Sequence, residues 1–466
     1  MTDYFPENST KIHRKAQCVA QILKEAGATE VFFVGGYVRD RLLGISSKDY
    51  DLEVYGLDYH TITAALSPHF GVNQVGKSFS VLKVDQQIDV ALPRREVKTG
   101  VGHKEFHVTA DSEMTFREAA ARRDFTINAI GMRMDGTLCD PYDGSGDLRR
   151  KILRAPTEAF CEDPLRVLRG MQFAARFGMD MEPRTVDLCR RVLPEFMTLS
   201  EERIFTEWEK WAVKGVFPEK GLDILAETGW ISCFPELEAL VGTAQNPKYH
   251  PEGDVFSHTK MVCAEAAKLA EETALTEEQR AVLMFTALCH DFGKPAVKSR
   301  SKDISPADHA RLHAERGAKI AETFLMKMKP PLWLVERVLP LITEHMAYLS
   351  AKMNPTAADV RHLSARLVPA NIRLWELLCT ADERGRGTGT PRKLSMCAVW
   401  GGKAREIGVY ERPPEPILLG RHLLERGFSP GQKMGKMLKR AWKAQLDGEF
   451  STLSEALEWL GRTDNG

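Results

Sequence analysis

Four short runs in a fixed order constrain the fold of this chain more than any other feature. They read Val-Gly-Gly-Tyr-Val-Arg-Asp at residues 34–40, Asp-Tyr-Asp at 49–51, Arg-Arg-Asp-Phe-Thr-Ile-Asn at 122–128 and Glu-Asp-Pro-Leu-Arg at 162–166. Their residue types suit, in turn, a phosphate-binding turn, a pair of metal-binding carboxylates, a clamp for a triphosphate and ribose, and a reader of a base. The interpretation rests on the presence of all four runs in this order, because no single run would support it.

The first run joins a predicted strand to a predicted helix. Residues 31–34 are apolar and β-branched or aromatic, which is typical of a buried strand. Gly35 and Gly36 end this strand, and residues 37–43 read as a helix that Gly44 stops. Such a junction points backbone N–H groups and the positive helix end at an anion, although a lone glycine pair is more often structural.

The second run predicts a metal site. Asp49 and Asp51 flank Tyr50 in a segment that reads as a strand, so both carboxylates would project from one face. Neighbouring carboxylates repel, and a hard cation such as Mg²⁺ relieves that repulsion. Residues 80–92 read as a hairpin whose second strand carries Asp89, which would complete the site if the two strands are neighbours. An exposed strand aspartate is an equal alternative for Asp89.

The last run predicts a base reader. Asp163 and Pro164 should open a helix, which places Asp163 and Arg166 on one face. An acceptor beside a donor complements the Watson–Crick edges of cytosine and adenine, whereas guanine and uracil would leave buried groups unpaired. On spacing alone, a salt bridge at the helix start explains this pair better than base recognition does, and an ion-pair cluster is the alternative for the arginines at 122–123.

Together these runs resemble the class II tRNA nucleotidyltransferases of the DNA polymerase beta superfamily, which include CCA-adding enzymes and bacterial poly(A) polymerases. One further run matches that family, Asp-Pro-Tyr-Asp-Gly-Ser-Gly-Asp-Leu at 140–148, and the match of the last run extends to Glu-Asp-Pro-Leu-Arg-Val-Leu-Arg at 162–169. The resemblance extends from about residue 31 to about residue 208.

The resemblance implies a role for each matching residue. Asp49 and Asp51, with Asp89 as a candidate third carboxylate, would bind catalytic Mg²⁺. The predicted nucleotide contacts are Gly35, Gly36, Arg39, Arg123, Asp124, Asn128, Asp163, Arg166 and Arg169. In the family, the equivalent of Arg123 meets the triphosphate, those of Asp124 and Asn128 hold the ribose, and the 140–148 run forms a hinge.

A second constellation lies in the middle of the chain, around Ala-Leu-Cys-His-Asp-Phe-Gly-Lys-Pro at 287–295. Histidine and aspartate gathered from several helices can enclose one or two metal ions and leave a position open for water. This pattern resembles the HD phosphohydrolase superfamily, with a divalent transition metal or Mg²⁺. The implied core ligands are His258, His290, Asp291 and Asp382, with His313 and His345 for a second ion. We expect His250 and His309 to be structural or surface groups, and a degenerate scaffold is the alternative for the whole domain.

The composition limits where RNA can bind and where the protein resides. Net charge is zero over 466 residues, so RNA contacts must come from local basic faces. The candidates are Arg149, Arg150, Lys151 and Arg154, and a helical series formed by Lys433, Lys436, Lys439, Arg440 and Lys443, for which a solvated face is an equal alternative. The nine cysteines form no C-x-x-C pair, and no apolar signal or membrane-spanning run is present, which favours a cytoplasmic protein without membrane contact.

The predicted fold is an α/β nucleotidyltransferase head, with a small mixed or antiparallel sheet and flanking helices, followed by a mostly α-helical body. We predict the head at residues 1–150, a helical neck with base recognition at 151–246, an HD-type domain at 247–385 and a helical tail at 386–466. The clearest linker is the glycine-rich run at 385–392, and residues 200–203 read as the capped start of a helix.

The predicted activity is addition of CCA to tRNA 3′ ends from CTP and ATP, with phosphatase or 2′,3′-cyclic phosphodiesterase activity in the HD domain. The alternatives within the family add only CC, only A or a poly(A) tail, and residues 95–106 are where such differences are expected. An HD hydrolase with an RNA-docking head and a non-catalytic RNA-binding protein are the alternatives of other classes. The oligomeric state is left open.

Overall fold

The computed structural model describes residues 7–47, 49–75, 81–98, 106–111, 113–298, 306–349, 354–387 and 395–464. The chain forms two compact units. Unit 1 comprises Met1–Trp208 and Lys220–Cys233, and unit 2 comprises Glu209–Glu219 and Phe234–Gly466. The four predicted segments divide the chain more finely than these units and stay a prediction.

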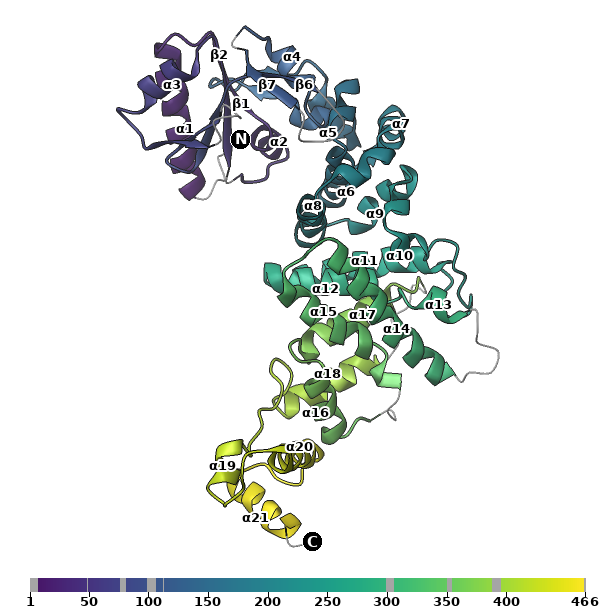
Figure 1. Ribbon diagram of the computed structural model, residues 1–466. Helices are drawn as coiled ribbons and strands as arrows, with labels where there is room; N and C mark the ends of the chain where they lie inside the picture. Colours follow the sequence, from purple (N-terminus) through teal and green to yellow (C-terminus); the bar gives the residue numbers. More distant parts are fainter. Residues whose placement is uncertain are drawn as a thin grey trace. The chain divides into compact units, whose positions relative to one another are not determined.

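Unit 1 is built on a mixed seven-stranded sheet of strand order β3-β4-β5-β2-β1-β8-β9 (Figure 1). The pair β2 and β5 is parallel, whereas the other neighbours are antiparallel. The strands are β1 (Glu30–Val34), β2 (Tyr50–Tyr55), β3 (Val72–Val75), β4 (Val81–Val84), β5 (Ile88–Ala91), β8 (Gly131–Met132) and β9 (Leu138–Cys139). A separate ribbon pairs β6 (Arg94–Lys98) with β7 (Phe106–Ala110), and β10 (Ile152–Leu153) pairs with β11 (Asp180–Met181).

The hairpin between β4 and β5 has the form that the sequence predicts. Asp85 and Gln86 adopt positive φ angles of 47° and 59°, which favour a tight reversal. Asp85 also accepts hydrogen bonds from Lys15 Nζ at 2.8 Å and from the backbone N–H of Gly71 at 2.9 Å. The reversal is therefore fixed at a defined length.

Helices and short turns complete unit 1. In Figure 1, α1 lies beside the sheet, where it contacts β1, β2 and α3. The helices are α1 (Glu7–Glu25), α2 (Gly36–Leu42), α3 (Tyr59–Leu66), α4 (Phe116–Ala120), α5 (Gly144–Arg150), α6 (Leu165–Phe177) and α7 (Pro183–Arg191), while α8 (Glu201–Lys214) and α9 (Pro218–Glu227) run across the unit boundary. The 3₁₀ turns are η1 (Thr126–Asn128), η2 (Glu158–Glu162), η3 (Leu193–Thr198) and η4 (Trp230–Cys233).

One part of the core of unit 1 explains a glycine in the sheet. Phe32, Tyr55 and Phe116 pack as a buried aromatic cluster. A Cβ atom at Gly131 would approach the Phe116 ring to 2.7 Å, which real Cβ contacts do not reach. Glycine at this position thus allows α4 to pack directly on the sheet.

The regular structure of unit 2 is helical in its described residues, apart from one isolated bridge between Ala244 and Asp254. Its centre is formed by α11, α12, α15 and α17, which pack against one another, and α16 packs on α18 and α20. The helices are α10 (Pro235–Glu238), α11 (Val255–Glu272), α12 (Glu277–Cys289), α13 (Lys294–Lys298), α14 (Pro306–Lys327), α15 (Leu332–Glu344), α16 (Ala357–Arg366), α17 (Ile372–Arg384), α18 (Met396–Glu406), α19 (Gly420–Leu424), α20 (Gln432–Asp447) and α21 (Leu453–Asp464), with the 3₁₀ turn η5 (Ala347–Leu349).

The structure also bears on the sequence predictions about membrane-spanning runs, cysteine pairing and the glycine-rich linker. Among the described residues, no helix combines the length and the apolar character that crossing a membrane requires. All nine cysteines are free thiols. Most of the glycine-rich run at 385–392 lies outside the described residues.

Candidate functional site

The glycine turn, one carboxylate and one arginine meet at the end of β1. Gly35 has φ +67° and precedes α2, so the chain turns sharply out of the sheet. A Cβ atom at Gly35 would lie 3.3 Å from Asp51 Oδ2 and 3.5 Å from Arg123 Nη1. Because Gly35 has no side chain, its backbone can lie close to both the Asp51 carboxylate and the Arg123 guanidinium.

The predicted carboxylate pair is only partly as expected. The ladder with β1 stops where Val34 faces Asp51, because Gly35 then leaves the sheet, and β2 begins at Tyr50. Asp49 is exposed and lies one residue before β2, so it is not part of the strand as predicted, but its charge is near enough to contribute to the raised pKa of Asp51.

The hairpin places Asp89 next to Asp51, as its sequence suggested. These residues face each other across the parallel pair of β2 and β5. Burial, and then the charge of Asp89, raises the pKa of Asp51 to about 6. Lys83 Nζ lies 3.0 Å from Asp89 Oδ1. The ionised form of Asp51 is thus unfavourable unless a cation lies nearby. Its carboxylate oxygens are the ligand type that a hard ion such as Mg²⁺ prefers.

The two arginines of the predicted clamp have different partners. Arg122 Nη2 lies 2.6 Å from Glu162 Oε2, in line with the ion-pair alternative. Arg123 Nη2 lies 3.2 Å from Glu53 Oε2, while its Nη1 faces the glycine turn. Arg123 is therefore the arginine placed to meet an anion at Gly35.

The predicted ribose contacts form a buried hydrogen-bonded chain. Asp124 Oδ1 accepts from Asn128 Nδ2 at 2.9 Å, and Asp124 Oδ2 accepts from Arg169 Nε at 2.7 Å. Burial alone would raise the pKa of Asp124, but Arg169 and Asn128 lower it to about 2. Asp124 is thus a fixed anion whose geometry depends on the two neighbouring side chains.

Arg39 is buried, although it was predicted among the nucleotide contacts. Its guanidinium donates to Asn128 Oδ1 at 2.7 Å and to Asp40 Oδ1 at 2.6 Å, and it lies over the rings of Phe173 and Phe177. Only 4% of Arg39 is exposed. The structure therefore places it behind Asn128 and not at an open surface.

The predicted base reader lies at the start of α6. Helix α6 starts at Leu165 with Pro164 as its cap, and Asp163 Oδ1 accepts from the N–H of Leu165 at 3.1 Å. Asp163 Oδ2 also accepts from Arg203 Nη2 at 2.8 Å. Asp163 has the extended backbone of a residue that caps a helix, and Pro164 after it has helical φ and ψ, so Asp163 retains the geometry of the predicted cap although α6 is bounded at Leu165.

Helix α6 is tied to the clamp segment at two points. Arg166 donates to the carbonyl oxygens of Ala159 and Arg122, both at 2.6 Å. Arg169, one turn further along, pairs with Asp124 at 2.6 Å. The base-reader helix and the ribose clamp are thus one connected structure.

In unit 2 the six predicted HD ligands come together and are all buried. They lie on α11, at the end of α12, on α14, at the end of α15 and on α17: His258, His290, Asp291, His313, His345 and Asp382. Ligand atoms lie within 4.8 Å of one another in two groups, one formed by His258, His290 and Asp291 and the other by Asp291, His313 and His345. Asp291 belongs to both groups.

Close packing at Gly293 brings the second group within reach. A Cβ atom at Gly293 would come within 1.9 Å of the carbonyl oxygen of His313, so only glycine allows α14 to approach the 287–295 run. His313 Nε2 then lies 3.6 Å from Asp291 Oδ1 and 3.1 Å from His345 Nε2.

Backbone carbonyls orient two of the histidines. His290 Nδ1 lies 2.8 Å from the carbonyl oxygen of Ala287, and His345 Nδ1 lies 2.6 Å from that of Ile342. Each contact places the ring proton on Nδ1 and leaves Nε2 to bind a metal. Burial, and then the charge of His313, lowers the pKa of His345 to about 3, which keeps the ring neutral.

Two cationic side chains that the sequence did not single out balance the acidic ligands. Lys294 Nζ lies 2.5 Å from Asp291 Oδ2, and Arg386 Nη2 lies 3.0 Å from Asp382 Oδ2. Burial would raise the pKa of both carboxyl groups, but these and neighbouring charges hold each pKa well below its ordinary value. Both cations follow their carboxylates by one helical turn, a spacing visible in the sequence.

The basic residues predicted to contact RNA differ in their exposure and pairing. The five basic residues of α20 are exposed, opposite the face that packs through Met434, Leu438 and Ala441. In contrast, Arg150 and Arg154 are both paired with Asp147. The side chain of His309 and the middle of the 95–106 segment lie outside the described residues.

A mixed-sheet head that gathers carboxylates and arginines at a glycine turn, joined to helices that enclose histidine and aspartate, defines a nucleotidyltransferase with an HD domain. Residues 31–154 match the family model of the Poly A polymerase head domain, and residues 255–374 match that of the HD domain. The chain belongs to the family of the multifunctional CCA proteins.

Two relatives illustrate the membership. The chain is 36% identical over 364 residues to the multifunctional CCA protein of Nitrosococcus oceani, covering 77% of this chain and 85% of the relative. It is 36% identical over 367 residues to that of Vibrio vulnificus, covering 77% and 86%.

Two solved structures share the fold. The Bacillus stearothermophilus CCA-adding enzyme in complex with CTP has a TM-score of 0.65 at 23% identity and covers 97% of this chain and 99% of its own. The Thermotoga maritima CCA-adding enzyme complexed with tRNA has a TM-score of 0.57 at 17% identity, covering 97% and 96%.

Proposed function

We propose that this chain adds C, C and A in order to the 3′ end of tRNA, using CTP and ATP. The observation that carries the proposal is the convergence of Gly35, Asp51 and Arg123. A turn that exposes backbone N–H groups, a carboxylate with a raised pKa and a guanidinium are what a metal-chelated triphosphate requires.

Asp49, Asp51 and Asp89 would hold Mg²⁺ beside the turn formed by Gly35 and Gly36. Bound there, Mg²⁺ would neutralise charge on the triphosphate and favour attack by the RNA 3′-hydroxyl. The protein needs no nucleophilic side chain of its own, because positioning and electrostatic stabilisation supply the catalysis.

The remaining residues of the head would bind and select the nucleotide. Arg123 would donate to phosphate oxygens, and Asp124 and Asn128 would accept and donate at the ribose. Asp163 and Arg166 would present an acceptor beside a donor to the base, which suits cytosine and adenine. In this reading Arg39 and Arg169 orient the ribose contacts from behind.

We further infer that unit 2 is a metal-dependent phosphohydrolase acting on phosphate monoesters or 2′,3′-cyclic phosphates. His258, His290, Asp291 and Asp382 would hold a divalent transition metal or Mg²⁺, with His313 as a ligand of a second ion together with His345. The donor set fits such ions, since His290 Nε2 and Asp291 Oδ2 are buried and lie 3.2 Å apart, close enough to bind one ion together. A bound ion would supply an activated water.

The test of the polymerase is a tRNA that lacks its 3′ end, incubated with Mg²⁺ and with CTP and ATP singly and together. Sequencing should show C, C and A in that order. Addition of C alone, of A alone or of long A tails would select one of the restricted polymerases instead.

The test of the hydrolase is His290→Ala, which should abolish release of phosphate and spare CCA addition. If both activities fall together, the separation of the two centres is wrong. The four-segment organisation and a cytoplasmic location are proposed on the same grounds, and the nine free thiols support a reducing compartment.

A further inference from the structure

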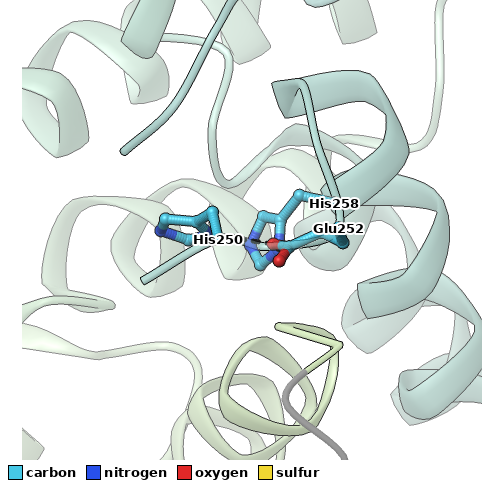
Figure 2. A group of neighbouring side chains, drawn as sticks. All are labelled: His250, Glu252 and His258. Atoms are coloured by element: carbon cyan, nitrogen blue, oxygen red, sulfur yellow. Dashed lines mark hydrogen bonds and ion pairs between the residues drawn. The ribbon is translucent and has the colours of Figure 1, made fainter. Parts of the chain in front are cut away.

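A carboxylate outside the predicted ligand set lies against one ring nitrogen of His258. Glu252 Oε1 is 2.8 Å from His258 Nδ1 and 2.8 Å from His250 Nδ1, so one oxygen serves two histidines (Figure 2). The side chain of Glu252 is only 2% exposed, and that of His258 is fully buried. Burial of a carboxylate away from water is unfavourable in free energy unless partner groups compensate for the loss of hydration.

The other ring nitrogen of His258 faces the HD carboxylates. His258 Nε2 lies 3.0 Å from Asp382 Oδ1 and 3.7 Å from Asp291 Oδ2. A negative charge 2.8 Å from Nδ1 favours the tautomer with the ring proton on that nitrogen, which would leave the lone pair at Nε2 and make the ring a stronger ligand. His290 and His345 obtain the same orientation from backbone carbonyls, whereas His258 obtains it from a negative charge.

The loop that carries Glu252 is anchored on both sides. Asp254 caps α11 by accepting from the N–H of Ser257 at 2.8 Å, and its second oxygen accepts from the N–H of Gly242 at 2.6 Å. On the other side Gly387, with φ +62°, passes so close that a Cβ atom there would lie 3.2 Å from Glu252 Cβ. Glu252 is therefore held in place by the fold.

We propose that Glu252 is a positioning residue for the metal centre of unit 2, that it fixes His258 with Nε2 toward the ion, and that His250 supports Glu252 from the solvent side. This inference rests on the proposed HD metal site. Metal ligands commonly depend on such partners, and loss of one weakens metal binding about 10- to 100-fold.

A separate ion held by His250, Glu252 and His258 is the competing arrangement, because their ligand atoms lie within 4.8 Å. It is disfavoured because His258 would then have to bind one ion through each ring nitrogen. That requires loss of the proton from both nitrogens.

The test uses the full chain, stripped of metal and titrated with Co²⁺ as the probe. Glu252→Gln keeps the size of the side chain and removes its charge, and should weaken Co²⁺ binding about 10- to 100-fold. Glu252→Asp should recover part of this loss, and His250→Ala should cost less than Glu252→Gln. Glu271→Gln, at a glutamate of α11 with 88% exposure, is the matched control, because α11 also carries His258.

Two further readouts separate positioning from a general loss of structure. The helical content of the metal-free chain, measured by circular dichroism, should be equal in Glu252→Gln and in the control. In the Co²⁺ form, the shifted, slowly exchanging ring N–H proton of His258 should move or disappear in Glu252→Gln.

Three outcomes would overturn the inference. Equal Co²⁺ affinity of Glu252→Gln and the unsubstituted chain would remove the role of Glu252 while leaving the HD metal site intact. An additional ion that His250→Ala abolishes would assign the cluster to an ion of its own. Failure of the unsubstituted chain to bind Co²⁺ would contradict the HD site itself.

Discussion

Arg39 donates from Nη1 to the amide oxygen of Asn128 at 2.7 Å, and both side chains are buried. Asn128 in turn donates to Asp124, which accepts from Arg169 on α6. A continuous hydrogen-bonded chain therefore connects the helix after the glycine turn with the helix that would read the base. Through this connection, the positions of the residues that would contact the triphosphate and of those that would contact the base depend on one another.

Arg39→Lys tests this connection. Lysine keeps the charge but lacks the planar fork that contacts Asn128 and Asp40 together. We expect kcat/KM to fall at least tenfold for CTP and ATP alike, and the unfolding free energy to fall by about 3 kcal/mol. Steady-state kinetics and urea unfolding would measure these changes. Arg41→Lys, at an exposed arginine of the same helix, should have little effect; equal effects of the two variants would refute the role of Arg39.

The raised pKa of Asp51 predicts that replacement of Asp51 by asparagine stabilises the chain to an extent that depends on pH. Folding raises this pKa from 3.8 to about 6, so the ionised group destabilises the fold fully above pH 6 and not below pH 3.8. Without Mg²⁺, Asp51→Asn should therefore stabilise the chain by up to about 3 kcal/mol at pH 8. The gain should vanish as the pH falls towards 4.

Thermal unfolding between pH 4 and pH 8 would check the Asp51 prediction. Asp187→Asn, at an exposed aspartate of α7, serves as the control and should show no such trend. A gain from Asp51→Asn that does not vary with pH would contradict the raised pKa.

Arg166→Ala should relax the choice of nucleotide. Removal of one hydrogen-bond donor to the base should reduce discrimination against UTP and GTP about ten- to a hundredfold, while pyrophosphate is still released. Competition between nucleotides on one tRNA substrate would measure it. Unchanged selectivity would restrict Arg166 to the structural contacts with Ala159 and Arg122.

The basic face of α20 should contribute a salt-dependent part of tRNA binding. If Lys436 and Lys443 each meet a phosphate, Lys436→Ala with Lys443→Ala should lower the slope of log K against log salt by about 2. Lys403→Ala on α18, whose lysine pairs with Glu406, is the control. A salt slope that stays the same would favour a solvated helix face.

Part of the architecture follows from sequence alone because local patterns determine it. The apolar run at 31–34, the glycine pair and the polar turn at 85–87 predicted β1, α2 and the hairpin that places Asp89 opposite Asp51. The HD ligands could be named because the run at 287–295 and the histidine and aspartate residues on or beside other helical-looking segments resemble the HD superfamily.

Other features depend on packing that no local pattern contains. Arg39 is buried because the rings of Phe173 and Phe177, distant in sequence, cover it. Glu252 meets His258 because its loop is fastened through Asp254 and lies under Gly387. The ladder of β1 ends before Asp49, a boundary set by the turn at Gly35.

The hairpin reversal at Asp85 and Gln86 has a consequence for how the head can change. Side chains alternate between the faces of a strand, so a deletion or insertion of one residue there would carry Asp89 to the opposite face from Asp51. Substitutions in that reversal should be tolerated over time, whereas changes in its length should be excluded. The proposed metal site thereby constrains the length of a surface turn that supplies none of its carboxylates.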